Sequence, residues 1–132
     1  MTRKVLLIGH CGPDSSYLRM AVRAAAPDAL VVAIDNDEEL DRTLGVGRQT
    51  SEEKCGVELA LVNRSLDFGF NQTSGVELIR ALKPAYPAVK FMLVSNYPDA
   101  QAAALKAGAI PGFGKRDIGS QVAKQALKSA LA

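Results

Sequence analysis

The feature that most constrains the fold is a short apolar run, Leu59-Ala60-Leu61-Val62, which ends at Asn63. A run of this kind has no polar face, so it is expected to form a strand that is buried on both sides. Such strands lie in the middle of parallel sheets, where helices cover both faces. Ligands bind these sheets at the carboxyl ends of the strands. Asn63 therefore stands where the chemistry of the protein is expected.

Alternating strand and helix patterns extend this architecture along the chain. Strands are predicted at 5–8, 30–34, 58–63, 89–95 and 109–113, and a helical pattern follows each of them. Pro111 interrupts the last strand, which indicates an edge position because proline cannot donate to the ladder. Crossovers between parallel strands are almost always right-handed, so helices must cover both faces. The prediction is a three-layer α/β/α sandwich of the flavodoxin-like type, with five helices and a five-stranded parallel sheet of order 2-1-3-4-5.

Caps and prolines predict where the helices begin and end. Either Asp14 or Ser15 is expected to cap the first helix. Pro84 and Pro87 are expected to close the third helix, because the residue before a proline disfavours helical geometry. The last helix is predicted over 118–131, with an inner face formed by Ile118, Val122, Ala126 and Leu127. The glycine-rich stretch 45–56 is predicted to be a mobile loop.

Composition predicts one globular domain over residues 1–132 and excludes several functional classes. Hydrophobic residues make up 48% of the chain and charged residues 23%, which is typical of a folded protein. The net charge is only +2 and the basic residues are scattered, so nucleic acid is not an expected partner. No apolar run is long enough for a membrane span or a secretory signal, so a cytoplasmic protein is expected. The cysteines, Cys11 and Cys55, are then expected to be reduced.

Four motifs carry a more specific signal. The central strand ends at Asn63, and Ser74-Gly75-Val76-Glu77-Leu78 follows with the spacing of a capping box. The fourth strand ends at Ser95, the next helix closes with Ala107-Gly108-Ala109, and Gly112-Phe113-Gly114-Lys115 forms the fifth strand and its end. Together these motifs resemble the receiver domains of bacterial response regulators, the CheY-like superfamily of two-component phosphorelay signalling. The resemblance spans the whole chain.

The resemblance also shows what the chain lacks. In receiver domains two acidic residues after the first strand join an acceptor aspartate to hold Mg²⁺, which prefers carboxylate and other hard oxygen ligands. Here Gly9 and His10 stand at the acidic positions and Asn63 stands at the acceptor position. The resemblance therefore implies a degenerate receiver, or pseudo-receiver, with no catalytic residue, metal ion or cofactor. Ser95 and Lys115 remain at the positions that sense the phosphoryl group in the family.

Nearby carboxylates leave one alternative open. Asp14, Asp35 or Asp67 can in principle replace the lost metal ligands, although a helix cap, a strand-end turn and a loop explain them equally well. Without an acidic cluster, Lys115 is expected to bond Asn63 or Ser95 instead.

Two aromatic features bear on switching and docking. In the family an aromatic residue that takes part in switching lies three residues before the lysine. This chain has Gly112 at that position, and its aromatic residue, Phe113, lies only two residues before Lys115. The loop after the central strand contains Phe68 and Phe70. These rings either cover the vacated acidic pocket or form a partner-docking loop.

The predicted function is therefore phosphorylation-independent protein–protein interaction, without enzymatic activity. The resemblance implies a histidine kinase, an output domain or another signalling protein as partner, and a homodimer through the face formed by the fourth helix, fifth strand and fifth helix. A first alternative is a small phosphocarrier or transferase that uses Cys11, as in phosphotransferase IIB domains, since a thiol at a helix N-terminus is activated. A second is a module that binds a nucleotide or small anion near Ser95 and Lys115.

Overall fold

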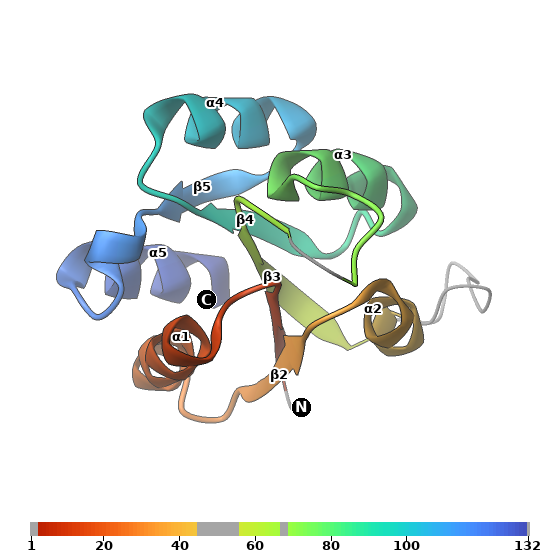
Figure 1. Cartoon of the computed structure of the whole chain (residues 1–132). Helices are drawn as coiled ribbons and strands as arrows, with labels where there is room; N and C mark the ends of the chain where they lie inside the picture. Colours follow the sequence, from red (N-terminus) through yellow and green to blue (C-terminus); the bar gives the residue numbers. More distant parts are fainter. Residues whose placement is uncertain (1–2, 45–55, 67–68, 132) are drawn as a thin grey trace.

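The computed structural model describes residues 3–44, 56–66 and 69–131, where strands and helices alternate (Figure 1). The strands are β1 (Lys4–Ile8), β2 (Leu30–Ile34), β3 (Val57–Asn63), β4 (Lys90–Val94) and β5 (Ile110–Phe113). The helices are α1 (Gly12–Ala25), α2 (Asp37–Leu44), α3 (Gly75–Ala85), α4 (Pro98–Ala107), the short 3-10 helix η1 (Lys115–Asp117) and α5 (Gln121–Leu131). The loop predicted at 45–56 falls almost entirely outside the described residues, as do Cys55, Asp67 and Phe68.

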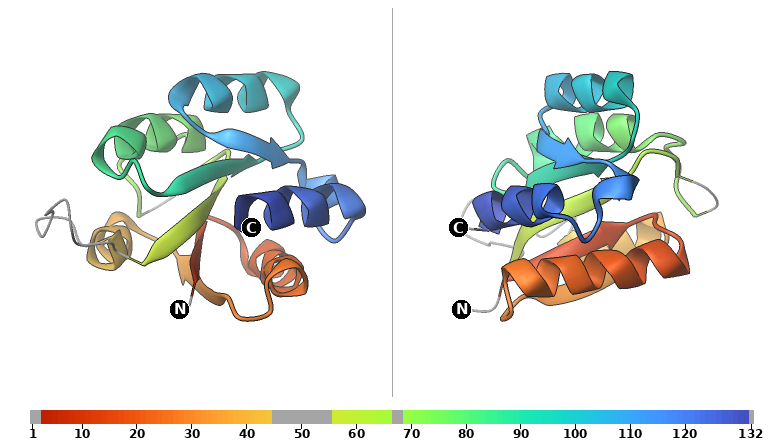
Figure 2. Two further views of the ribbon diagram at one scale, coloured as in Figure 1. Left: turned by 180° about the vertical axis from the view of Figure 1, so that it is seen from behind. Right: turned by 90° about the vertical axis from the view of Figure 1, so that its left-hand side faces the viewer.

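In the described part of the chain, five parallel strands form one sheet in the order β2-β1-β3-β4-β5, which confirms the predicted fold class. The buried side chains divide into two clusters, one on each face of the sheet. One cluster joins the sheet to α1 and α5, and the other joins it to α2, α3 and α4. Figure 2 shows the resulting three layers from behind and from the side. Pro111 lies in the edge strand β5, as predicted.

The central strand is buried on both faces. Residues 59–62 are at most 1% exposed, and they alternate between the two clusters, with Leu59 and Leu61 on one side and Ala60 and Val62 on the other. Their alternation follows from the twofold repeat of a strand. The register pairs Val62 with Ile8 and Asn63 with Val94. Asn63 therefore lies level with the ends of β1 and β4.

The start of α1 differs from the prediction. Cys11 is the N-cap residue, and Asp14 belongs to the first turn, so neither Asp14 nor Ser15 caps the helix. Pro13 explains the early start, because its fixed φ suits the first helical turn, where its missing N–H group has no helical partner to lose.

Helix α3 follows its predicted cap only in part. The Ser74 hydroxyl accepts a hydrogen bond from the Val76 N–H group at 3.2 Å. Glu77 forms an ion pair with Arg80 instead of completing the capping box. Of the two prolines expected to close the helix, Pro84 lies inside it, and the helix ends at Ala85, before Pro87.

The last helix begins later than predicted. Gly119 has a φ of +88°, which no right-handed helix contains, so α5 starts only at Gln121. Ile118 precedes the helix, and Val122 is 59% exposed rather than part of the inner face. The inner face consists of Ala123, Leu127, Ala130 and Leu131. None of the helices in the described ranges is long and apolar enough to cross a membrane.

Candidate functional site

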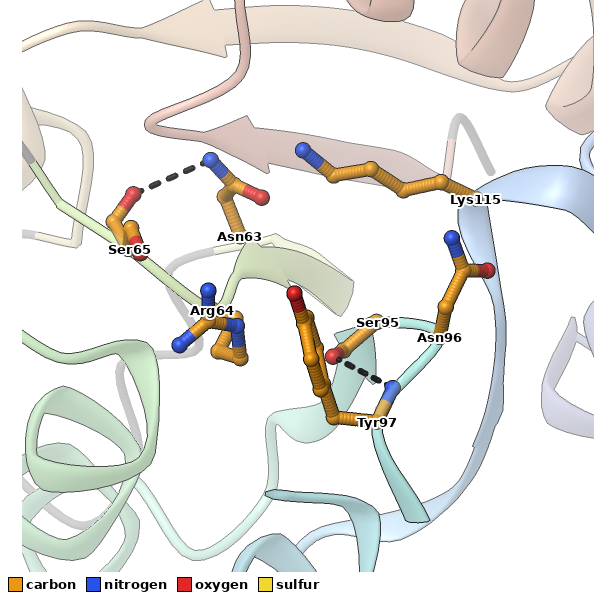
Figure 3. A pocket seen from close by; sticks show the side chains of 7 residues that line it. All are labelled: Asn63, Arg64, Ser65, Ser95, Asn96, Tyr97 and Lys115. Atoms are coloured by element: carbon orange, nitrogen blue, oxygen red, sulfur yellow. Dashed lines mark hydrogen bonds between the residues drawn. The ribbon is translucent and has the colours of Figure 1, made fainter. Parts of the chain in front are cut away.

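A pocket of about 270 Å³ opens at the carboxyl ends of β3 and β4 (Figure 3). Its walls come from three segments: the end of β3 with the residues after it, the link from β4 to α4, and Lys115, the second residue after β5. The lining residues are Asn63, Arg64, Ser65, Ser95, Asn96, Tyr97 and Lys115. Two of these side chains are cationic and none is acidic.

Asn63 is held by both hydrogens of its side-chain amide. The Nδ2 group donates to the carbonyl oxygen of Gly9 at 3.1 Å and to that of Ser65 at 3.0 Å. The Oδ1 atom is buried and has no partner among the described residues. The amide thus ties the end of β1 to the loop after β3, and it offers no carboxylate oxygen to an incoming phosphoryl group.

Apolar side chains occupy the space beside Gly9, the first of the two positions that are acidic in the family. Gly9 has a φ of +75°, and a Cβ atom there would lie 2.4 Å from Cδ2 of Leu66 and 3.8 Å from the Phe70 ring. Leu66 is 4% exposed, and Phe70 packs against the same buried cluster. A side chain at position 9 would therefore require the end of the Leu66 side chain to shift. Phe70 lies over this site, whereas Phe68 is not among the described residues.

His10, at the second acidic position, turns its ring inward. Its Nε2 atom lies 2.9 Å from the carbonyl oxygen of Leu61 in the central strand, so Nε2 carries the hydrogen and donates it. Nδ1 is buried without a partner among the described residues. Burial lowers the pKa of His10 from 6.5 to about 4, although the bond to Leu61 opposes this shift. The ring is consequently neutral near pH 7 and supplies neither the negative charge nor the oxygen ligand that Mg²⁺ prefers.

Lys115 pairs with a carboxylate that comes from α1. Its Nζ atom lies 3.4 Å from Oδ2 of Asp14. The expectation that Lys115 bonds Asn63 or Ser95 was wrong, since neither shares a hydrogen bond with it in the described chain. Asp14 can reach Lys115 because α1 and α5 pack side by side on one face of the sheet. Asp35 lies elsewhere, at the turn into α2, where its N–H group donates to Glu39.

The link from β4 to α4 presents hydrogen-bond donors to the pocket. Ser95 is 4% exposed, and its Oγ atom accepts the Tyr97 N–H group at 3.1 Å, which leaves the hydroxyl hydrogen available. The Oδ1 atom of Asn96 accepts the Arg116 N–H group at 3.1 Å, which leaves the Nδ2 group of Asn96 available.

Arg64 and Tyr97 form a wall of the pocket that the sequence analysis missed. The guanidinium carbon of Arg64 lies 4.4 Å from the centre of the Tyr97 ring, which is a cation–π contact. The positions of these residues next to Asn63 and Ser95 were the available signal, because residues just after strand ends in a parallel sheet line its binding edge.

The strand β5 carries no switch aromatic. A Cβ atom at Gly112 would lie 2.1 Å from the carbonyl oxygen of Leu93, so no ring fits at this position. Phe113 is 3% exposed and belongs to the buried cluster under α1 and α5. Gln101, also missed from sequence, donates from Nε2 to the carbonyl oxygens of Leu93, Ser95 and Phe113 at 2.9, 3.1 and 3.3 Å. It fastens α4 to both strands.

The pocket does not fit the Mg²⁺ ion that the resemblance to receiver domains implies. Its side chains supply an amide, hydroxyls and two cations, whereas Mg²⁺ prefers carboxylate oxygens in octahedral geometry. Among the residues that the structure describes, no group of three or more His, Cys, Asp or Glu side chains gathers as a metal site. Cys11 is exposed at the start of α1 and is not part of the pocket.

No protein-family model and no curated protein matches the chain. Solved structures do match it over nearly its full length. A signal receiver domain from Colwellia psychrerythraea superposes with a TM-score of 0.73 at 14% identity, covering 98% of both chains. A response regulator from Thermotoga maritima gives 0.66 at 20% identity, covering 98% of this chain and 99% of that one. A response regulator from Burkholderia pseudomallei, solved with a phosphorylated aspartic acid, a calcium ion and citrate, gives 0.61 at 19%, covering 98% and 70%. The chain therefore has the fold of a response-regulator receiver domain.

Proposed function

We propose that this chain is an atypical receiver domain of two-component-type signal transduction, which is not phosphorylated on an aspartate and acts through contacts with other proteins. The observation that carries the proposal is the neutral Asn63 at the acceptor position, with both of its amide hydrogens bound to the backbone.

The chemistry of the pocket supports the loss of phosphorylation. Phosphoryl transfer to a receiver needs a carboxylate nucleophile and a metal ion that neutralises the developing charge. The Burkholderia pseudomallei protein holds both a phosphorylated aspartic acid and a calcium ion. This chain has Gly9, His10 and Asn63 at the corresponding motif positions, and cations rather than carboxylates line its pocket.

The choice of α4, β5 and α5 as the contact surface rests on analogy with the matched fold. Tyr97, Leu105 and Val122 are 58%, 48% and 59% exposed on or beside these elements. Tyr17, Met20 and Leu30 are exposed to a similar extent elsewhere, and apolar side chains exposed singly are ordinary on folded proteins. By analogy with the matched fold, the expected partner is a histidine kinase, an output domain, another signalling protein or a second copy of the chain.

The proposal is tested by amide NMR in the presence of Mg²⁺ and beryllofluoride, a phosphoryl mimic. We expect no saturable shifts at Asn63 or Ser95, because no carboxylate is present to bind the mimic. A receiver with an intact acceptor aspartate serves as the positive control. Metal-dependent, saturable shifts centred on Asn63, or a covalent phosphate found after incubation with acetyl phosphate, would refute the proposal.

An Asn63→Asp variant sharpens this test. It restores the acceptor but not the other two carboxylates, and Leu66 still fills the space beside Gly9. We expect this variant to remain unresponsive to beryllofluoride. A response to Mg²⁺ and beryllofluoride would show that a neighbouring carboxylate completes the metal site.

A further inference from the structure

The pocket between β3, β4 and the segment after β5 combines positive charge with unused hydrogen-bond donors. We propose that it binds a small anion of the phosphate class, non-covalently and without a metal ion. This binding is a separate proposal from the protein contacts above, although Tyr97 belongs both to the lining of the pocket and to the exposed surface beside α4.

The side chains that line the pocket carry a net positive charge. Arg64 and Lys115 are cationic, and the other lining residues are neutral. The Arg64 guanidinium is held against the face of Tyr97 at 4.4 Å, which limits its rotation and favours a defined position. Charge-assisted bonds from Arg and Lys to an oxyanion are stronger than neutral hydrogen bonds.

Two neutral hydrogen-bond donors, Ser95 and Asn96, line the pocket from the link between β4 and α4. The Ser95 hydroxyl already accepts the Tyr97 N–H group, so its hydrogen is free to donate. The Asn96 side chain accepts the Arg116 N–H group through Oδ1, so its Nδ2 group can also donate. Only the N-cap residue Tyr97 separates them from α4, a helix of 10 residues whose N-terminal end adds partial positive charge.

The arrangement of donors favours phosphate over carboxylate. Arg64 follows β3, Ser95 and Asn96 follow β4, and Lys115 follows β5, so the donors come from three strand ends. A tetrahedral anion has oxygens for each of these directions, whereas a carboxylate has two oxygens in one plane. The volume of about 270 Å³ is near the lower limit for ligand pockets, at about 300 Å³. It therefore suits phosphate itself or a small phosphorylated molecule.

Asp14 acts as an internal competitor in this arrangement. Its carboxylate lies 3.4 Å from the Lys115 ammonium group, outside the set of residues that line the pocket. An anion in the pocket must share Lys115 with Asp14 or displace it. Removing the Asp14 charge should therefore tighten anion binding, while removing the Lys115 charge should weaken it.

The test is a titration of the ¹⁵N-labelled protein with sodium phosphate at pH 7.5, with sodium chloride keeping the ionic strength constant. We expect saturable shifts at Arg64, Ser95, Asn96 and Lys115, unchanged by Mg²⁺ or by a chelator. The amide spectrum of each variant also shows whether it is folded. Equal shifts with chloride alone, or acetate binding as tightly as phosphate, would overturn the assignment.

Three variants and a matched control complete the design. Lys115→Met and Arg64→Met should each weaken phosphate binding about tenfold, since each removes one charge-assisted bond. Asp14→Asn should tighten it about threefold, because a partly exposed ion pair competes only weakly. Lys128→Met removes an exposed lysine from the last turn of α5, away from the pocket, and should leave the affinity unchanged. Unchanged affinity in both Lys115→Met and Arg64→Met would refute the site.

Discussion

The ammonium group of Lys115 lies 3.4 Å from the carboxylate of Asp14, and this ion pair joins the first turn of α1 to the segment that follows β5. The resemblance to receiver domains implies that Lys115 senses a phosphoryl group. In the structure its partner is instead a carboxylate on α1. The pair is partly exposed, with 39% and 26% of the two side chains accessible. It is therefore a contact that solvent screens and that an anion can exchange.

Breaking this ion pair should change stability only slightly. A double-mutant cycle of Asp14→Asn and Lys115→Met should give a coupling energy below about 1 kcal/mol, because solvent screens partly exposed pairs. Urea unfolding at low and high salt measures it, and the coupling should shrink as salt increases. A coupling of several kcal/mol that does not depend on salt would mean that the pair is buried in solution.

Substitution at Gly9 should be more damaging than at Gly119, another glycine with positive φ. Gly9→Ala places a methyl group 2.4 Å from Cδ2 of Leu66 in addition to the strain of a φ of +75°. The backbone strain costs about 1–2 kcal/mol, and the overpacking adds about 1–3 kcal/mol. Urea unfolding should show both losses.

Gly119 provides the matched control for Gly9. It has a φ of +88°, and a Cβ atom there would meet nothing within 4 Å. Gly119→Ala should therefore lose only about 1–2 kcal/mol from backbone strain. Equal losses at the two positions would show that Leu66 moves aside freely, and the space beside Gly9 would then be open to a larger side chain.

The stability of the fold should depend on pH through His10. Its pKa is lowered from 6.5 to about 4 in the folded protein, so between these values the unfolded chain binds a proton that the folded protein does not. Stability is therefore fully present above pH 6.5 and falls as the pH drops towards 4. The expected loss is about 3 kcal/mol, given about 1.4 kcal/mol for each pKa unit.

Comparison with a His10→Gln variant separates the contribution of His10 to the pH dependence of stability from that of the carboxylates, which also titrate in acid. Glutamine keeps a donor for the Leu61 carbonyl but does not titrate. The difference in unfolding free energy between the two proteins should change by about 3 kcal/mol between pH 7 and pH 4. A difference that stays constant over this range would contradict burial of the ring in its neutral form.

Gln101 should matter for stability although it is far from the sequence motifs. Gln101→Met removes the Nε2 donor that the carbonyl oxygens of Leu93, Ser95 and Phe113 share. The loss should be about 1–3 kcal/mol, since each hydrogen bond contributes about 0.5–1.5 kcal/mol. Amide hydrogen exchange in α4 should also accelerate. The control Gln125→Met lies on the exposed side of α5 and should leave both quantities unchanged.

Local patterns were sufficient to predict the sheet and its order, whereas long-range contacts were not predictable. The apolar run before Asn63 identified the central strand because burial on both faces leaves a continuous pattern. Gly108 was correctly expected to end α4, since its left-handed φ of +110° favours glycine. The inner face of α5 was wrong by one position at Val122, because the prediction placed the start of the helix before Gly119.

The site was harder to predict for a different reason. The end of the central strand identified Asn63, and the resemblance to receiver domains implied Ser95 and Lys115 beside it, but the partner of Lys115 comes from a helix more than a hundred residues earlier in the chain. The contact between Arg64 and Tyr97 likewise depends on how two loops leave adjacent strands. No local sequence pattern encodes such pairings, which exist only once the layers have packed.

The contact between Leu66 and the space beside Gly9 also bears on how such a chain can evolve. An acidic side chain at position 9 requires Leu66 to shift or to become smaller, and a smaller residue at position 66 alone leaves a cavity in the core. Each substitution made alone is therefore expected to lower the stability of the fold, so an acidic residue is expected to return to position 9 only together with a change at Leu66.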